Sequence, residues 1–216
     1  AFSRQSKIKL FMLSIIIVNF KNPALLRLCL KSLEHTLSPK LDYEILVVDI
    51  SSEIETRNVV LEEFPKVKLL SFKENIGYTK GVNEGIKISS GNYFLILNSD
   101  IVPLKNSIET LLDYMKEHQD VGLAGPQLLN FDGTPQQSCF GFYNAITIGY
   151  RRVGYLPFKK RVLKRFLLEG KDLSSTRFVD WLMGSALMAR RDAVDKVGLM
   201  DEKFFLYFSD IDWARR

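Results

Sequence analysis

Polar side chains that could bind a ligand follow three apolar runs of the kind that forms buried strands. They are Asn19 after residues 14–18, Asp49 after residues 43–48 and Asp100 after residues 93–97. In an open α/β sheet the ligand crevice lies beyond the carboxyl ends of the strands, so we expect these side chains to meet in one crevice. Each of them taken alone has an alternative role, because Asn and Asp also end strands for backbone reasons.

Asp100 is the residue that we expect to bind a metal ion. The sequence has neither GxGxxG after its first predicted strand nor GxxxxGK[ST], which argues against a nicotinamide dehydrogenase and a P-loop kinase. A phosphate-bearing ligand then needs another partner, and Mg²⁺ binds one or two carboxylates together with substrate phosphates and water. The alternative for Asp100 is an aspartate that caps its own loop.

Two further carboxylates follow an aromatic run near the end of the chain. Residues 204–208 lead through Ser209 into Asp210 and Asp212. Burial beside aromatic rings raises the pKa of a carboxylate and makes it a stronger proton acceptor, as a general base for a sugar hydroxyl requires. The alternative is an N-cap for a helix that starts at Trp213, and Asp212 fits that alternative better than Asp210.

Glycines recur every four residues at Gly77, Gly81 and Gly85, shortly after Asn75. At this spacing they lie along one face of a predicted helix. Three glycines in one helix are expected where the absence of their side chains has a structural or a functional role. Either the helix packs closely on the sheet, or its first turn leaves the backbone open to a nucleotide phosphate or sugar.

The elements that must position these residues alternate along the first half of the chain. Strands are predicted at residues 14–18, 43–48, 67–72 and 93–97, and helices from Asn22 to about Leu37, from Ser52 to about Phe64 and from Tyr78 to Ser89. Strands that alternate with helices of this length predict an α/β fold with a mostly parallel central sheet and helices on both faces.

The second half of the chain is less regular. We expect a helix at residues 106–118, a turn at Asp132 and Gly133, strands at residues 121–124, 178–183 and 186–189, and a helix at residues 192–197. Residues 12–216 are expected to form one domain, with a nucleotide-binding half at 12–103 and an acceptor-facing half at 104–216. Residues 1–11 are expected to be a leader or an added extension.

Composition supports a single folded domain. The chain has 216 residues, of which 46% are apolar and 25% charged, and these values are typical of a soluble globular protein. Its two cysteines, Cys29 and Cys139, have no CxxC spacing, and it has two histidines. This excludes a disulfide scaffold, a cysteine zinc site and HExxH chemistry, and it suits a reducing compartment.

The net charge of +5 comes from one segment. Residues 151–166 hold seven basic residues and no acid, and without them the remainder has a net charge of −2. We expect a loop and a short amphipathic helix here, whose role is a solvated surface, contact with an anionic membrane or a phosphate-bearing acceptor, or nucleic-acid binding. The near-neutral charge of the remaining residues argues against a broad surface for binding nucleic acid.

No apolar run is long enough to span a bilayer, so we expect a cytoplasmic protein. It would lie at the inner face of the membrane if residues 151–166 bind lipid.

Six motifs in order resemble glycosyltransferase family 2 with the GT-A fold, and especially its rhamnosyltransferase-like branch. They are SIIIVNF, YEILVVD, NIGYTKGVNEG, YFLILNSD, WLMGSALMARR and DEKFFLYFSDID, and they cover the chain from about Leu13 to its end. The resemblance implies an inverting enzyme that transfers a sugar, such as rhamnose, from a dTDP- or UDP-sugar. The sugar would be transferred to a hydroxyl group of a saccharide or of a lipid-linked acceptor, in cell-surface polysaccharide synthesis. The cofactor would be Mg²⁺ or Mn²⁺.

The resemblance also implies roles for single residues, carried over by position. Val18 and Asn19 would border the nucleoside, Asp49 would accept a hydrogen bond from the N3 of uracil or thymine, and Asn75 and Gly77 would lie near the nucleotide. Asp100 would bind the metal ion on the diphosphate, Gly184, Ser185 and Asp212 would lie at the donor and acceptor sugars, and Asp210 would be the catalytic base.

Three features depart from the family's pattern. Ile50 stands where an asparagine is common, Ser209 replaces the usual glutamate beside the base, and the chain stops at Arg216, inside the last predicted helix. We therefore expect a truncated C-terminus and keep an alternative, a catalytically impaired nucleotide-sugar-binding protein of the same fold. A nucleotidyltransferase is a further alternative, although it normally needs a glycine-rich phosphate loop that this sequence lacks.

Overall fold

A six-stranded sheet forms the centre of this computed structural model, which describes residues 12–51, 53–153, 155–168 and 175–216. The strand order is β3 (Lys68–Ser71), β2 (Tyr43–Asp49), β1 (Leu13–Asn19), β4 (Tyr93–Asn98), β8 (Ala186–Arg190) and β5 (Leu123–Ala124). The first four strands in this order are parallel, and β8 is antiparallel to both of its neighbours. The prediction of a mostly parallel sheet is confirmed.

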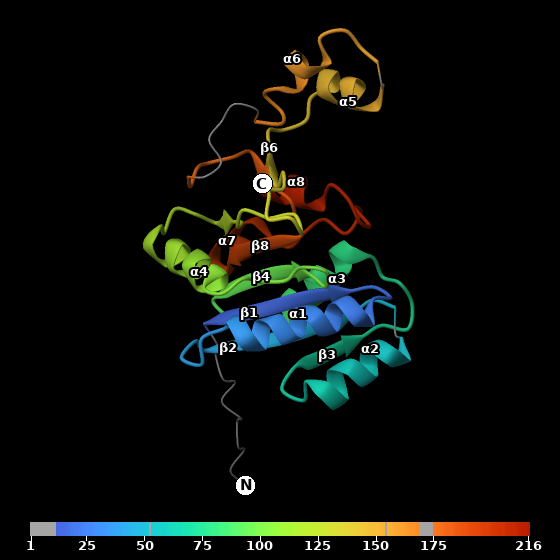
Figure 1. Cartoon of the computed structure of the whole chain (residues 1–216), viewed down its shortest axis with the longest axis vertical. Coiled ribbons are helices and arrows are strands. Elements are labelled where there is room, and N and C mark those ends of the chain that lie inside the picture. The colour runs from blue at the N-terminus through green and yellow to red at the C-terminus, as the bar shows by residue number, and fades with distance from the viewer. Residues whose placement is uncertain (1–11, 52, 154, 169–174) are drawn as a thin grey trace.

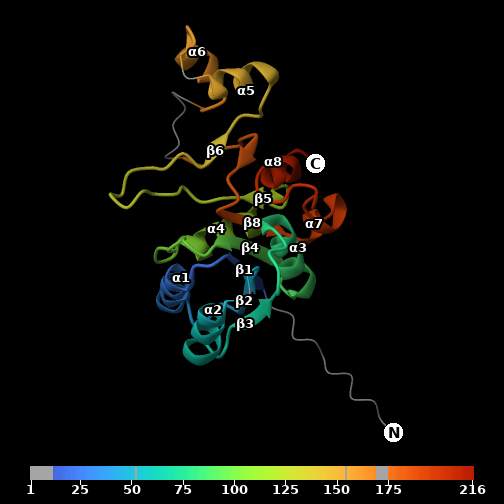
Figure 2. The same cartoon turned by 90° about the vertical axis from the view of Figure 1, so that its right-hand side faces the viewer.

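Helices cover both faces of this sheet (Figure 2). One face carries α1 (Pro23–Thr36), α2 (Ile54–Asn58), the π-helical turn η1 (Val59–Glu63) and α4 (Ser107–Glu117), and the other carries α3 (Tyr78–Ile88) and α7 (Arg191–Val197). Successive side chains of a strand point to opposite faces. Accordingly, Ile15 and Ile17 of β1 belong to the hydrophobic core under α1, whereas Ile16 and Val18 belong to the core under α3.

Local signals at helix ends account for some boundaries. The Asn22 side chain accepts a hydrogen bond from the Leu25 N–H at 3.3 Å, and Pro23 is the first helical residue of α1, as predicted. Ser52, the predicted cap of the next helix, lies outside the described residues. The helix predicted from there to about Phe64 is found as α2, which begins at Ile54, and the π-helical turn η1 that follows it directly. This turn buries Val59 and Val60 against the core.

The second half adds a smaller layer beyond the β8 side of the sheet. It comprises β6 (Cys139–Phe140) paired with β7 (Trp181–Leu182), and the helices α5 (Ala145–Arg152), α6 (Lys159–Leu163) and α8 (Ser209–Arg215). The strand predicted at residues 178–183 is limited to two residues, and the basic segment contains the end of α5 and the whole of α6. Figure 1 shows α5 and α6 at the end of the molecule opposite β3 and α2.

The last helix begins earlier than predicted. Phe208 has a left-handed backbone (φ 72°), and its carbonyl accepts a hydrogen bond from the Asp212 N–H at 3.0 Å, which closes the first turn of α8. Ser209 and Trp213, four residues apart, are the buried face of this helix. Asp212 is therefore inside the helix, which rules out the alternative that it is the N-cap.

The glycines of α3 permit close packing on the sheet. A Cβ on Gly81 would lie 2.9 Å from Ile50 Cγ2, and one on Gly85 would overlap Ile16 Cγ2. Both isoleucines are buried core residues, so their side chains cannot move aside without a cost. The close-packing alternative is therefore confirmed for these two positions.

Replacing Gly85 by Ala should lower the stability of the protein. The helix gains about 1 kcal/mol in propensity, but overpacking against Ile16 costs about 1–3 kcal/mol. Urea unfolding measures the difference. Gly149→Ala on α5 is the matched control, because a Cβ there meets nothing within 4 Å, and it should raise stability by about 0.5–1 kcal/mol. A stabilising Gly85→Ala would contradict the packing argument.

Candidate functional site

The carboxyl ends of β1, β2 and β4 meet at one edge of the sheet. Asn19 is the register partner of Asp49, and Val18 is the register partner of Asn98. Adjacent strands lie about 4.8 Å apart. The Asn98 N–H donates to the carbonyl of Ser185 at 2.9 Å, which brings the segment before β8 to the same edge. The predicted adjacency of the strand ends is confirmed, whereas the meeting of Asn19, Asp49 and Asp100 in one crevice stays a prediction, because none of the three lines the cavity described below.

Two fully buried side chains at this edge keep unpaired oxygens. Asn19 donates through Nδ2 to the Thr56 hydroxyl at 3.1 Å, and Asp49 Oδ1 accepts from the Ser51 hydroxyl at 3.1 Å. Asn19 Oδ1 and Asp49 Oδ2 are buried and have no hydrogen-bond partner. Buried polar atoms normally have partners. Both oxygens can therefore accept hydrogen bonds from a ligand, and the Thr79 hydroxyl in the first turn of α3 is unpartnered in the same way.

Asn75 and Gly77 form the turn that leads into α3. Asn75 Oδ1 accepts from the Gly77 N–H at 2.9 Å. Gly77 has a φ of +83°, and a Cβ there would lie 2.7 Å from the carbonyl oxygen of Phe205. The turn is thus packed against the aromatic segment 204–208, which follows it by more than a hundred residues in sequence.

Asp210 lies in the first turn of α8, where two backbone N–H groups hold its carboxylate. Oδ2 accepts from Gly184 at 3.0 Å and Oδ1 from Ile211 at 2.9 Å. Burial raises the pKa of Asp210 above the ordinary aspartate value, although these hydrogen bonds oppose the shift. The predicted effect of burial on this carboxylate is confirmed, and it makes Asp210 a stronger proton acceptor.

Tyr78 links the two halves of the site. Its hydroxyl donates to the Gly184 carbonyl at 2.8 Å, and the Gly184 N–H donates to Asp210, so the two side chains bind the successive peptide groups on either side of the Gly184 Cα. Burial, followed by the negative charges of Asp210 and Asp100, raises the pKa of Tyr78 above its ordinary value. The phenol therefore remains a hydrogen-bond donor at neutral pH.

A cavity of about 740 Å³ lies in front of Asp210. Its polar side is formed by Tyr78, Asn98, Gly184, Ser185 and Asp210, and its other walls are aromatic and apolar apart from Arg151 and Arg152. Phe140 and Trp181 stack at 4.6 Å between ring centroids on the aromatic side. A cavity that combines an apolar wall with a few convergent polar groups is typical of a small-molecule site.

Asp100 is exposed in the loop after β4. It follows β4 by two residues and does not line the cavity. Within the described residues, no group of three or more His, Cys, Asp or Glu side chains could hold a metal ion. A Mg²⁺ ion that also binds substrate phosphates and water needs as little as one carboxylate, and an exposed Asp100 fits that requirement.

Asp212 lies away from the other predicted residues. Its carboxylate accepts a hydrogen bond from Arg216 Nε at 2.9 Å along α8, and it does not line the cavity. The structure therefore brings Asp210, Gly184 and Ser185 together but leaves Asp212 outside. The sugar-binding role of Asp212 stays a prediction.

Sequence reasoning missed Tyr78 and the position of the arginines in the cavity. One sequence feature could have identified Tyr78, namely its position directly after Gly77 at the start of the glycine-containing helix. Arg151 and Arg152 were predicted only as part of a basic segment.

No helix within residues 12–51, 53–153, 155–168 and 175–216 is long and apolar enough to cross a membrane.

Solved structures share this fold. Staphylococcus aureus TarS matches with a TM-score of 0.64 and 17% identity, over 94% of this chain and 32% of TarS. The mannosyltransferase PcManGT from Pyrobaculum calidifontis, solved in complex with GDP-Man and Mn²⁺, matches with a TM-score of 0.58 and 16% identity, over 90% of this chain and 48% of that chain. The predicted GT-A type of α/β fold is confirmed.

Curated relatives are similar over most of this chain. The N-acetylglucosaminyl-diphospho-decaprenol L-rhamnosyltransferase of Mycobacterium tuberculosis is 28% identical over 84% of this chain and 62% of that protein. The low-salt glycan biosynthesis hexosyltransferase Agl10 of Haloferax volcanii is 27% identical over 94% of this chain and 61% of that protein. The chain thus spans about three fifths of the length of these relatives. The model of the family "Glycosyl transferase family 2" matches residues 14–169, and the chain belongs to this family.

Proposed function

We propose that this chain is an inverting glycosyltransferase. It would transfer a sugar, such as rhamnose, from a nucleoside diphosphate sugar to an acceptor hydroxyl in cell-surface polysaccharide synthesis. The observation that carries the proposal is the position of Asp210. Its carboxylate has a raised pKa, is held by the Gly184 N–H, and lines a cavity between the sheet edge and an aromatic wall. Family membership and the named relatives support the same activity.

The donor nucleotide would bind to the half formed by residues 12–103. Asp49 Oδ2 and Asn19 Oδ1 are buried acceptors without partners, and uracil and thymine both present an N3–H donor. Val18 precedes this pair on β1 and would border the nucleoside, while Asn75 and Gly77 would line the nucleotide at the turn before α3. Residues 104–216, which supply the aromatic wall, would face the acceptor.

Asp100 would hold Mg²⁺ or Mn²⁺ on the donor diphosphate. Bound there, the ion would neutralise negative charge that develops on the departing diphosphate. Asp100 suits this role because its side chain is exposed just beyond the carboxyl end of β4. The Mn²⁺ bound by the related mannosyltransferase structure supports the proposal.

Asp210 would remove the proton of the acceptor hydroxyl as that oxygen attacks the donor sugar. Attack from the face opposite the diphosphate inverts the configuration at the sugar carbon. The N–H of Gly184 orients the carboxylate, and Tyr78 holds the adjacent Gly184 carbonyl. Ser209 is 1% exposed, so the residue beside the base faces the core. One carboxylate would therefore perform the proton transfer.

Replacing Asp210 by Asn should lower kcat/KM by about 10²–10⁴-fold, the usual contribution of a positioned general base. Binding of the nucleoside diphosphate, followed by thermal shift, should remain. Asp195→Asn on the exposed face of α7 is the matched control and should keep full activity. Equal activity of Asp210→Asn and the unmodified protein would refute the assigned base. Nucleotide binding without any turnover of the unmodified protein would instead indicate the impaired binding protein.

The rate should depend on the protonation of Asp210. Because burial raises its pKa, kcat/KM should rise with pH through a midpoint above about 3.9, the ordinary aspartate value. Stability should change in the opposite direction. The folded pKa lies above the unfolded one, so the contribution of Asp210 to folding is complete below the unfolded pKa and is lost as the pH rises through the folded pKa.

Rate profiles and thermal unfolding across pH measure both effects. Asp210→Asn should lose this acidic limb in any residual activity, and its stability should lose the dependence on pH that Asp210 contributes, because an amide does not titrate. A midpoint at or below the ordinary aspartate value would contradict the role of burial.

Nucleoside diphosphates should stabilise the protein selectively. At a hundred times Kd a ligand adds about 2.7 kcal/mol to stability, so UDP or dTDP with Mn²⁺ should raise the unfolding temperature clearly. Asp49→Asn should reduce this shift, and Asp100→Asn should remove the part that requires Mn²⁺, whereas Asp195→Asn should change neither. A shift by GDP that Asp49→Asn leaves intact would contradict pyrimidine recognition.

A further inference from the structure

Two guanidinium groups line the cavity opposite the sheet edge. Arg151 and Arg152 form the last turn of α5 and line the same cavity as Asp210. The helix that carries them starts with a capping box, in which Asn144 Oδ1 accepts from the Thr147 N–H at 2.8 Å and Thr147 Oγ1 from the Asn144 N–H at 2.9 Å. Figure 1 shows α5 beyond β6 and α8, away from β1 and β2.

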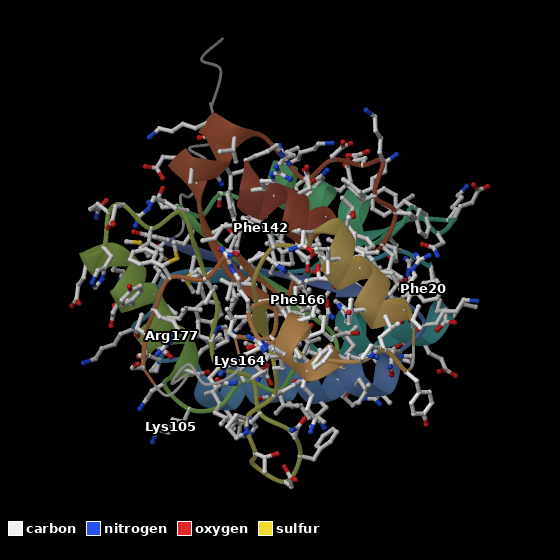
Figure 3. The ribbon with its side chains drawn as sticks, turned by 90° about the horizontal axis from the view of Figure 1, so that it is seen from above. Phe20, Lys105, Phe142, Lys164, Phe166 and Arg177 are labelled. Atoms are coloured by element: carbon white, nitrogen blue, oxygen red, sulfur yellow. The ribbon has the colours of Figure 1, made fainter. Side chains whose placement is uncertain are left out.

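Aromatic rings hold Arg151 in place. Its guanidinium carbon lies 5.6 Å from the ring centroid of Tyr143 and 5.3 Å from that of Phe166, and it donates to the Tyr143 hydroxyl. Tyr143 in turn packs against Phe166 at 4.6 Å and against Phe208 at 5.9 Å. In Figure 3, viewed from above, Phe166 lies with α5 and α6 in front of the sheet. The arginine is therefore positioned relative to the segment that leads into Asp210.

These guanidinium groups have no counter-charge among the described residues. No described carboxylate forms an ion pair with Arg151 or Arg152. Asp210 is the one carboxylate among the described residues that line the cavity, and residues 151–166 contain no acid. Both arginine side chains are exposed. The acceptor side of the cavity thus presents an excess of positive charge.

We propose that the acceptor is a phosphate-bearing sugar, and that Arg151 and Arg152 bind its phosphate. Guanidinium groups form paired hydrogen bonds with phosphate oxygens, for which arginine is better suited than lysine. The sugar ring would pack on Phe140 and Trp181 and present its hydroxyl to Asp210. This inference rests on the proposed function, because it names the acceptor of that reaction.

The donor diphosphate is the other phosphate in the reaction, and the proposed function places it elsewhere. Asp100, its proposed metal ligand, follows β4 at the carboxyl edge of the parallel strands, where Asn19 and Asp49 would bind the base. Arg151 belongs instead to α5 and packs on the rings of Tyr143 and Phe166. The two arginines therefore suit a second phosphate, on the acceptor.

Binding of two matched probes tests the inference without any turnover. The probes are a decyl diphosphate-linked hexose and the decyl glycoside of the same hexose, titrated without donor and followed by tryptophan fluorescence, since Trp181 lies in the cavity wall. The diphosphate probe should bind at least about tenfold more tightly, as expected for hydrogen bonds between charged groups. Its advantage should weaken as salt is raised.

The double variant Arg151→Gln/Arg152→Gln should bind both probes equally and should bind UDP and dTDP as the unmodified protein does. Lys31→Gln/Lys196→Gln removes the same charge from exposed positions on α1 and α7 and should keep the preference. Equal binding of the probes by the unmodified protein would overturn the inference. So would a loss of nucleotide affinity in the arginine variant, which would assign the pair to the donor.

A membrane surface is the competing partner for these arginines. If the arginine variant loses binding to vesicles of anionic phospholipid but keeps the preference for the diphosphate probe, the pair serves the membrane and the inference fails. Failure of the proposed function is a separate result. In that case the diphosphate probe binds with the arginine-dependent preference, yet no sugar is transferred to it.

Discussion

Burial of the central strands on both faces is the constraint on which the site depends. Every residue of β1 is buried, in a sheet that helices cover on both faces. Such strands have no face on which a polar side chain can reach solvent or a ligand. The polar groups that these strands offer to a ligand are therefore confined to the strand ends, where the backbone leaves the sheet.

The two ends of β2 show how different these positions are. Glu44, near the start of the strand, is bound by the Ser14 hydroxyl at 2.7 Å, by Lys68 at 2.7 Å and by the Ser90 N–H at 2.6 Å. Asp49, at the other end, keeps one oxygen without a partner. Both carboxylates are buried, but only the second has an acceptor oxygen left for a ligand. Glu44 thus stabilises the fold, and Asp49 is the better ligand residue.

The backbone of Gly184 connects the halves of the molecule. Tyr78 comes from α3 in the first half and binds the Gly184 carbonyl, and Asp210 comes from α8 in the second half and binds the Gly184 N–H. The turn at Gly77 has no room for a side chain because Phe205 lies against it. The proposed nucleotide and acceptor regions are therefore packed as one unit, so a change in the aromatic segment 204–208 would be felt at the turn before α3.

The sequence alone was enough to predict the α/β class, the four parallel strands, the cap at Asn22 and the polar strand ends at Asn19, Asp49 and Asp100. These features depend on periodicity and on residues close in the chain, and the family resemblance added Gly184, Ser185 and Asp210 by position. Only the structure showed that β8 lies antiparallel beside β4 and that α8 begins at Ser209. It also showed that the Asp212 carboxylate binds Arg216, and that Tyr78 and Arg151 line the cavity. Those outcomes depend on packing between residues that are distant in the chain, or on which face of a helix is buried, and local patterns do not record either.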